Sequence, residues 1–277
     1  MKDLSDIPFI MGDKSWYLLS VFYARESWHE LVTQINQFYR ERKDKFSHCL
    51  LAFSEDKGER IDISLASLPG QENRKAEIEQ FFLSFVEKLP STRKAVFPYG
   101  NAVWDNYPNN TLLWWRFRTM DLSDLYVSFH QATFQFARSL IENDTSPDTL
   151  FSVCIYLIVK GLTCIEPKKQ KTVLSRALHD TSIDFKNLSH VDSVKTLINE
   201  RIDFREISST LESYRNENES EFSPELKAWL TDVKILMDHY SYSQFCSFIC
   251  TMFGLKGLRQ LAILELINTW YNNIANE

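Results

Sequence analysis

Alternating apolar and polar positions predict strands in the first part of the chain. The runs Trp16–Tyr23 and His48–Phe53 are rich in aromatic and β-branched residues, as strands are. Arg60–Leu65 alternates isoleucine and leucine with Asp62 and Ser64, so these two polar side chains should share one face of a strand. Because only a short turn separates the second run from the third, we expect these two strands to form a hairpin.

Apolar residues at helical spacing predict helices between and after these strands. We expect a helix over Trp28–Phe38, started by a capping box of Ser27 and Glu30, and another over 73–88. From residue 122 the pattern is helical to the end. Its most apolar run, Leu150–Ile165, is shorter than a membrane span and contains a lysine, which indicates a buried helix. Further helices are expected near 168–179, 191–201, 203–215, 224–238, 241–253 and 257–274.

This order of elements predicts an α+β protein, with a sheet-containing N-terminal part packed on a largely helical C-terminal part. We expect residues 1–277 to form a single domain, strand-rich over 1–120 and helical over 121–277. A length of 277 residues allows one large domain or two closely packed ones.

Composition narrows the class of protein. Only 7 glycines are present, and neither G-x-G-x-x-G nor a P-loop occurs, which argues against the usual nucleotide-binding folds. A net charge of -6 argues against a nucleic-acid partner. The five cysteines form no C-x-x-C and no signal peptide is visible, so we expect free thiols in a cytoplasmic protein. Aromatic residues reach 14%, enough to line a groove as well as a core.

Three stretches, in order, resemble the family of thiopeptide-type bacteriocin biosynthesis proteins, which includes the C-terminal elimination domain of lantibiotic dehydratases. Ile10–Leu19 resembles the family's opening h-G-x-x-W followed by apolar residues. The hairpin F-F-I-R-Y-S-D-P and H-L-R-L-R is matched by Leu50–Asp56 and Arg60–Ser64. The C-terminal S-h-I-H-M, N-R-L and aromatic tail are matched by Ser247–Met252, then a Gly-Leu pair and Glu265–Tyr271. The resemblance spans nearly the whole chain.

The departures from the family pattern concern its ionic groups. In the dehydratases, the resemblance implies that the hairpin arginines and the C-terminal histidine handle a glutamylated Ser or Thr. Here Asp62 and Ser64 stand at the arginine positions, Cys250 at the histidine position and Gly254-Leu255 at the N-R pair. An aspartate there would repel a glutamate leaving group, so elimination by the family's usual residues is not expected.

A branch of the same family lacks this ionic set and forms the pyridine ring of thiopeptides. The resemblance therefore implies a cofactor-independent cyclase that joins two dehydroalanines of a precursor peptide in a formal [4+2] cycloaddition, then loses water and leader peptide. Two alternatives stay open: a divergent glutamate-elimination lyase of a split dehydratase, and a non-catalytic subunit that binds the precursor peptide for a partner dehydratase. None of the three implies a metal, a membrane or a nucleic acid.

The candidate site residues follow from these patterns. For substrate binding we expect Asp62 and Ser64 and, on a strand predicted over 111–119, Trp114, Arg116 and Arg118 on one shared face. An edge strand with a solvated cationic face would give the same pattern. For catalysis the candidates are Tyr240, Tyr242, Ser247 and Cys250. Helix-start packing would also account for the tyrosines, and a small buried side chain would account for Cys250.

Overall fold

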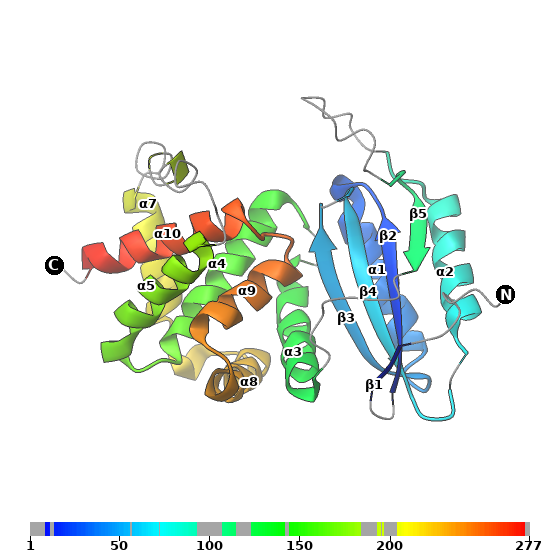
Figure 1. The fold of residues 1–277 in the computed structure, drawn as a ribbon, viewed down its shortest axis with the longest axis horizontal. Helices are drawn as coiled ribbons and strands as arrows, with labels where there is room; N and C mark the ends of the chain where they lie inside the picture. Colours follow the sequence, from blue (N-terminus) through cyan, green and yellow to red (C-terminus); the bar gives the residue numbers. More distant parts are fainter. Residues whose placement is uncertain are drawn as a thin grey trace. The chain divides into compact units, whose positions relative to one another are not determined.

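The chain divides into two compact units, residues 1–149 and 150–277. The computed structural model describes residues 9–11, 14–55, 57–71, 73–92, 107–114, 123–141, 144–183, 193–194, 196 and 204–274. The first unit contains a sheet with helices on it, and the second is helical (Figure 1). The predicted α+β class is thereby confirmed.

The sheet of the first unit is antiparallel and, within the described residues, has five strands. They are β1 (Phe9–Met11), β2 (Lys14–Phe22), β3 (Phe46–Ser54), β4 (Arg60–Ser67) and β5 (Thr111–Trp114). Their order is β1-β2-β4-β3, and β5 also pairs with β2. The sequence predicts four of these strands and misses β1, which has only three residues. Of the strand predicted over 111–119, the part after Trp114 lies outside the described residues.

The predicted hairpin is formed by β3 and β4. Ala52 lies opposite Asp62, and Leu50 lies opposite Ser64. In the turn, Lys57 has φ 59° and Gly58 has φ 121°. A side chain at position 58 would therefore be strained, and its Cβ would also lie 3.2 Å from the ring of Phe22.

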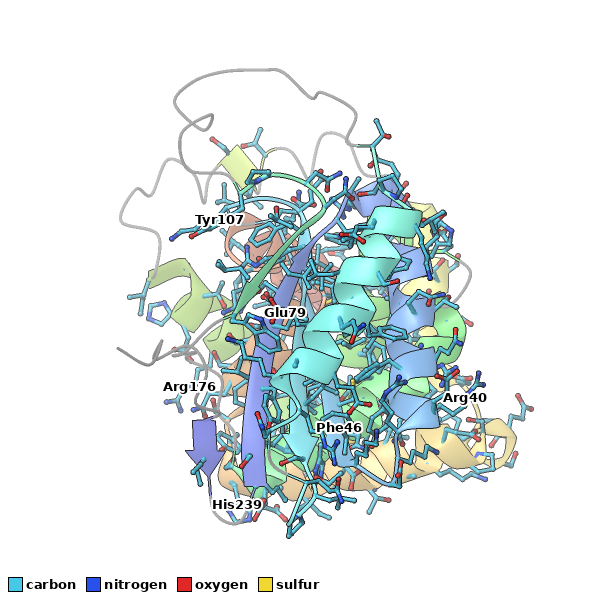
Figure 2. The ribbon with its side chains drawn as sticks, turned by 90° about the vertical axis from the view of Figure 1, so that its right-hand side faces the viewer. Arg40, Phe46, Glu79, Tyr107, Arg176 and His239 are labelled. Carbon is cyan, nitrogen blue, oxygen red and sulfur yellow. The ribbon has the colours of Figure 1, made fainter. Side chains whose placement is uncertain are left out.

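Two helices, α1 (Trp28–Glu41) and α2 (Lys75–Lys88), cover one face of the sheet. Figure 2 shows them side by side. Aromatic rings fill the interfaces of these helices with the sheet and with each other. The ring centre of Trp28 on α1 lies 5.1 Å from that of Phe53 on β3, and the ring centre of Phe38 on α1 lies 5.5 Å from that of Phe82 on α2. The helix over Trp28–Phe38 and the helix over 73–88 are therefore confirmed, with small differences in their ends.

The expected capping box at the start of α1 is wrong. Ser27 has φ -108° and ψ 9°, outside the extended region of an N-cap, and makes no side-chain capping bond. The cause is the 3₁₀ turn η2 (Arg25–Ser27), which leads directly into the helix. Glu30 instead accepts a hydrogen bond from the hydroxyl of Tyr23 at 3.3 Å.

Helix α3 (Asp124–Ile141) lies on the other face of the sheet. Its Val127 forms a buried cluster with Trp16, Leu50 and Ala66, one residue from each of three neighbouring strands. The buried His130 donates from Nε2 to the carbonyl oxygen of Leu51 at 2.6 Å. This bond satisfies a backbone group at the edge strand β3.

The second unit is a group of helices around the apolar α4 (Pro147–Thr163). The others with described bounds are α5 (Pro167–Ile183), α7 (Phe204–Asn216), the short η4 (Glu219–Glu221), α8 (Pro224–His239), α9 (Tyr242–Met252) and α10 (Leu258–Ile274). The predicted helix over 191–201 lies outside the described residues except at 193–194 and 196. Gly161 allows α4 and α9 to approach, because a Cβ there would lie 2.4 Å from the ring of Phe245. The unit is thus tightly packed at its centre.

Candidate functional site

A row of polar side chains crosses the middle of the otherwise apolar sheet. Along β4, Arg60, Asp62 and Ser64 point to the same face because side chains alternate along a strand. Ser20 of β2 lies directly opposite Asp62, so it joins this row from the neighbouring strand. The row occupies the same face as Trp16 and therefore faces the side on which α3 packs.

The centre of this row is the carboxylate of Asp62. Its Oδ1 accepts hydrogen bonds from Nε of Arg60 at 3.0 Å and from the hydroxyl of Ser20. Asp62 is 4% exposed and Arg60 9% exposed, while Ser20 and Ser64 are 0% exposed. A carboxylate so deeply buried must be paired with a cation to remain stable, and Arg60 supplies that cation.

The chemical character of the row follows from this pairing. Arg60 and Asp62 neutralise each other, so the row has guanidinium and hydroxyl groups but no surplus of charge. The Arg60 guanidinium also lies 5.7 Å from the centre of the Phe22 ring, which favours a cation. Such a row can position or polarise a neutral amide, but it offers no net positive charge for a carboxylate.

Trp114 lies on the opposite face of the sheet from Asp62 and Ser64. It pairs with Leu19 of β2, whose side chain points away from the Asp62 row. Its ring lies 5.5 Å from Nζ of Lys75 on α2. The expected partners on the same face, Arg116 and Arg118, lie outside the described residues. The sheet thus separates Trp114 from the two β4 residues with which we grouped it.

The four candidate catalytic residues lie at or near α9 in the helical unit. Tyr242 is buried and donates its hydroxyl proton to the carbonyl oxygen of Ile158 at 3.0 Å. Burial and nearby thiols raise the pKa of Tyr242 well above its ordinary value. Cys250 is buried with its Sγ 3.7 Å from that of Cys154. These two side chains face α4, inside the unit.

Tyr240 and Ser247 are more accessible than these two. Both are half-buried, and the ring of Tyr240 meets Phe248 edge-on at 5.3 Å. Ser241, which lies between the two tyrosines, forms a capping box with Gln244 that starts α9. After α9, Gly254 has φ 69°, so the position of the family's asparagine holds a helix-ending glycine.

Sequence reasoning missed Arg60 and Ser20 as members of the polar row. Arg60 could have been found, because its two-residue spacing from Asp62 places both side chains on one face of a strand. Ser20 carries a weaker signal, as a single hydroxyl inside an apolar strand. Its position opposite Asp62 depends on a pairing between β2 and β4 that local pattern does not specify.

The described residues contain no group of three or more His, Cys, Asp and Glu side chains placed to hold a metal ion. The same part of the chain has no helix with the length and apolar character needed to cross a bilayer.

Comparison with known proteins identifies the fold. No protein-family model matches the sequence, and no curated protein matches it. Among solved structures, the chain is similar to the pyridine synthase TbtD from thiomuracin biosynthesis, with TM-score 0.65 and 12% identity over 94% of this chain and 99% of that chain. It is also similar to TsrL, with TM-score 0.55 and 10% identity over 95% of this chain and 96% of that chain. These likenesses confirm the pyridine synthase-like fold that the sequence resemblance implies.

Proposed function

We propose that this protein acts in the biosynthesis of a ribosomally made peptide natural product and forms a pyridine ring by a formal [4+2] cycloaddition. The observation that carries the proposal is the fold shared with a pyridine synthase over nearly the full length of both chains. We treat residues 1–277 as one functional domain, located in the cytoplasm, with a dehydrated precursor peptide as its substrate and no cofactor.

The reaction requires positioning rather than a redox partner. One reacting partner is a dehydroalanine together with the amide that precedes it, and the other is a second dehydroalanine. Two carbon–carbon bonds form between these partners. The amide oxygen then leaves as water, and the leader peptide leaves as a carboxamide. No electrons enter or leave, so the enzyme has to fold the peptide into the reactive conformer and polarise one amide.

The residues proposed for these tasks differ in accessibility. In the sheet unit, Arg60 is the most exposed member of the row at 9% and would polarise the amide, while the buried Asp62 and Ser64 would position it from within the sheet. In the helical unit, the half-buried Tyr240 and Ser247 are the candidates for direct contact. Tyr242 and Cys250 are buried, so we assign them the positioning of α9 against α4.

The polar row argues against the alternative of a glutamate-elimination lyase. Elimination requires cations that hold the glutamate carboxylates, whereas Arg60 is already paired with Asp62. Each missing arginine–carboxylate contact would remove about 1.5–3 kcal/mol of interaction. A partner dehydratase would then supply the dehydrated peptide, and this protein would act after it.

The test is incubation of the purified protein with a precursor peptide that contains two dehydroalanines, followed by mass spectrometry. The proposal predicts a product that has lost water together with the leader peptide. An unchanged peptide that nevertheless binds the protein would contradict the proposal and support the non-catalytic binding subunit. Loss of glutamate from a glutamylated peptide would support the lyase.

A further inference from the structure

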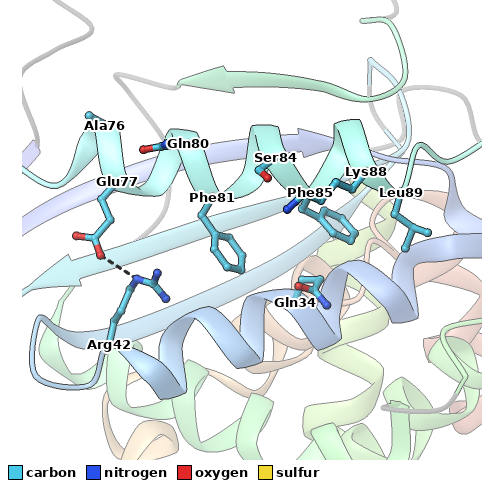
Figure 3. Close-up of a pocket in the computed structure, with 10 residues that line it drawn as sticks. All are labelled: Gln34, Arg42, Ala76, Glu77, Gln80, Phe81, Ser84, Phe85, Lys88 and Leu89. Carbon is cyan, nitrogen blue, oxygen red and sulfur yellow. Dashed lines mark hydrogen bonds and ion pairs between the residues drawn. The ribbon is translucent and has the colours of Figure 1, made fainter.

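A groove runs between α1 and α2 on the side of these helices away from the sheet, with a volume of about 760 Å³ (Figure 3). Phe81 and Phe85 point from α2 toward α1, and Gln34 of α1 points toward them. The contact of Arg42 with Glu77 closes one end, and Leu89 lies at the other. The volume is in the range of ligand-binding clefts, roughly 300–1,000 Å³.

The closed end of the groove is rich in cations. The carboxylate of Glu77 is shared by Nε of Arg42 at 2.8 Å, Nζ of Lys45 at 2.8 Å and a guanidinium nitrogen of Arg74 at 3.4 Å. Arg42 also reaches Glu41 at 3.2 Å. Lys88 lines the groove toward its other end.

The residues that line the groove leave a surplus of positive charge. Arg42 and Lys88 are cationic and Glu77 is anionic, which gives one uncompensated positive charge. Lys45 and Arg74 contact Glu77 but do not line the groove. The whole chain carries a net charge of -6, so this cationic groove is a local exception. Complementary charge therefore favours an acidic ligand.

The walls of the groove carry hydrogen-bonding groups that are not in use. Among the described residues, the side chains of Gln34, Gln80 and Ser84 have no hydrogen-bond partner. Gln34 and Ser84 are half-buried and Gln80 is exposed, so a ligand in the groove could reach all three. Amides and a hydroxyl above aromatic rings suit an extended peptide, whose backbone N–H and C=O groups need partners.

We propose that the groove between α1 and α2 binds an extended acidic segment of the precursor peptide, with apolar side chains against Phe81 and Phe85. The identity of the ligand as a precursor peptide rests on the proposed function. The lining residues of α2 and its C-cap run from Ala76 to Leu89, about 20 Å along the helix, which matches about six residues of extended chain.

The probe is a fluorescein-labelled octapeptide that alternates acidic residues (Asp, Glu) with Leu and Phe, compared with the same peptide carrying Asn and Gln in place of the acids. Fluorescence polarisation should show saturable binding of the acidic peptide, and binding of the amide peptide weaker by about tenfold, equivalent to ~1.4 kcal/mol. Ser84→Tyr, which fills the groove, should abolish binding. Leu83→Tyr, at the neighbouring exposed position outside the groove, should leave it unchanged.

A charge variant provides an independent check that does not alter the shape of the groove. Lys88→Glu should weaken binding of the acidic peptide by about three- to tenfold, because an attraction becomes a repulsion. Lys43→Glu, at an exposed position that does not line the groove, should change the affinity much less. Circular dichroism of all four variants should match the unmodified protein.

Equal binding of the acidic and amide peptides, unchanged binding by Ser84→Tyr, or no binding at all would overturn the groove proposal. The probe contains no dehydroalanine, so this result is separate from the cyclisation assay. A protein that binds the acidic probe but leaves a dehydrated peptide unchanged would refute the proposed function alone. A protein that cyclises the dehydrated peptide but ignores the probe would refute the groove alone.

Discussion

The sheet unit and the helical unit each bury a cation beside a carboxylate, and they do so in different ways. In the sheet unit, Arg60 and Asp62 are both buried and lie two residues apart on one strand. In the helical unit, Lys160 is 1% exposed, whereas its partner Glu217, at 2.7 Å, keeps 36% of its side chain exposed. Because both members of the first pair are desolvated, each depends on the other far more than Glu217 depends on Lys160.

The two pairs also differ in the groups that surround them. Lys160 of α4 has its Nζ 4.4 Å from the centre of the Phe222 ring, and Glu217 also accepts a hydrogen bond from Tyr156 at 3.0 Å. This arrangement anchors the segment after α7 onto α4. The pair on β4 belongs instead to a row of polar groups across a sheet face. The helical pair thus joins two segments of its unit, whereas the sheet pair is the one to which the proposed function assigns a role.

The largest expected effect comes from leaving one buried charge without its partner in the sheet. Asp62→Ala should destabilise the protein by about 3–5 kcal/mol, because Arg60 would stay buried without its carboxylate. The double variant Arg60→Met with Asp62→Leu should recover most of that loss, since no charge remains. Urea titration measures both. Asp44→Ala, at an exposed aspartate, is the control and should cost little.

A double variant as unstable as Asp62→Ala would show that the pair contributes through shape rather than charge. The comparison between the two units would then lose its electrostatic basis.

The second prediction concerns the helical pair, in which Lys160 is buried and Glu217 is partly exposed. Glu217→Ala should destabilise the protein by about 1–3 kcal/mol, because Lys160 would stay buried without its carboxylate. The cost should be smaller than that of Asp62→Ala, since the partly exposed site of Glu217 lets water reach the ammonium group. Lys160→Met should be close to neutral, since the released Glu217 can be hydrated while a methionine fills the buried site. The same urea titration tests both variants. A larger cost for Lys160→Met than for Glu217→Ala would reverse the asymmetry.

The third prediction extends the comparison to buried thiols and concerns an effect that appears only above neutral pH. Burial raises the pKa of Cys49 in the sheet unit to about 12, from an ordinary value of 9.0. The folded protein therefore keeps this proton longer than the unfolded chain, so its contribution to stability is present below pH 9 and disappears as pH rises toward 12. The free energy of unfolding should fall across that window, and less steeply in Cys49→Ala.

Burial also raises the pKa of Cys154 and Cys246 in the helical unit, with Cys250 contributing in both cases. Cys164 is the half-buried cysteine, so it should be the first thiol to react with Ellman's reagent in the native protein. Rapid reaction of the buried thiols would contradict the close packing of α4 against α9.

Local pattern predicts much of the fold of both units. The alternation on β4 places Asp62 and Ser64 on one face, and the apolar run around Lys160 predicts its burial. The partners are less predictable, because Ser20 and Glu217 meet their partners only through contacts distant in sequence. The face of Trp114 could not be predicted for the same reason, since it depends on which residue of β2 lies opposite.

The central claim is that the charge-balanced row of Arg60 and Asp62 belongs to an enzyme for dehydrated rather than glutamylated peptides. The most direct measurement supplies one precursor peptide in both forms, mixed in a single reaction with the purified protein, and follows each by liquid chromatography and mass spectrometry. We expect the form with two dehydroalanines to lose water and leader peptide, while the glutamylated form remains as stable as it is in buffer. Loss of glutamate at a rate above that in buffer, with the dehydrated form unchanged, would contradict it.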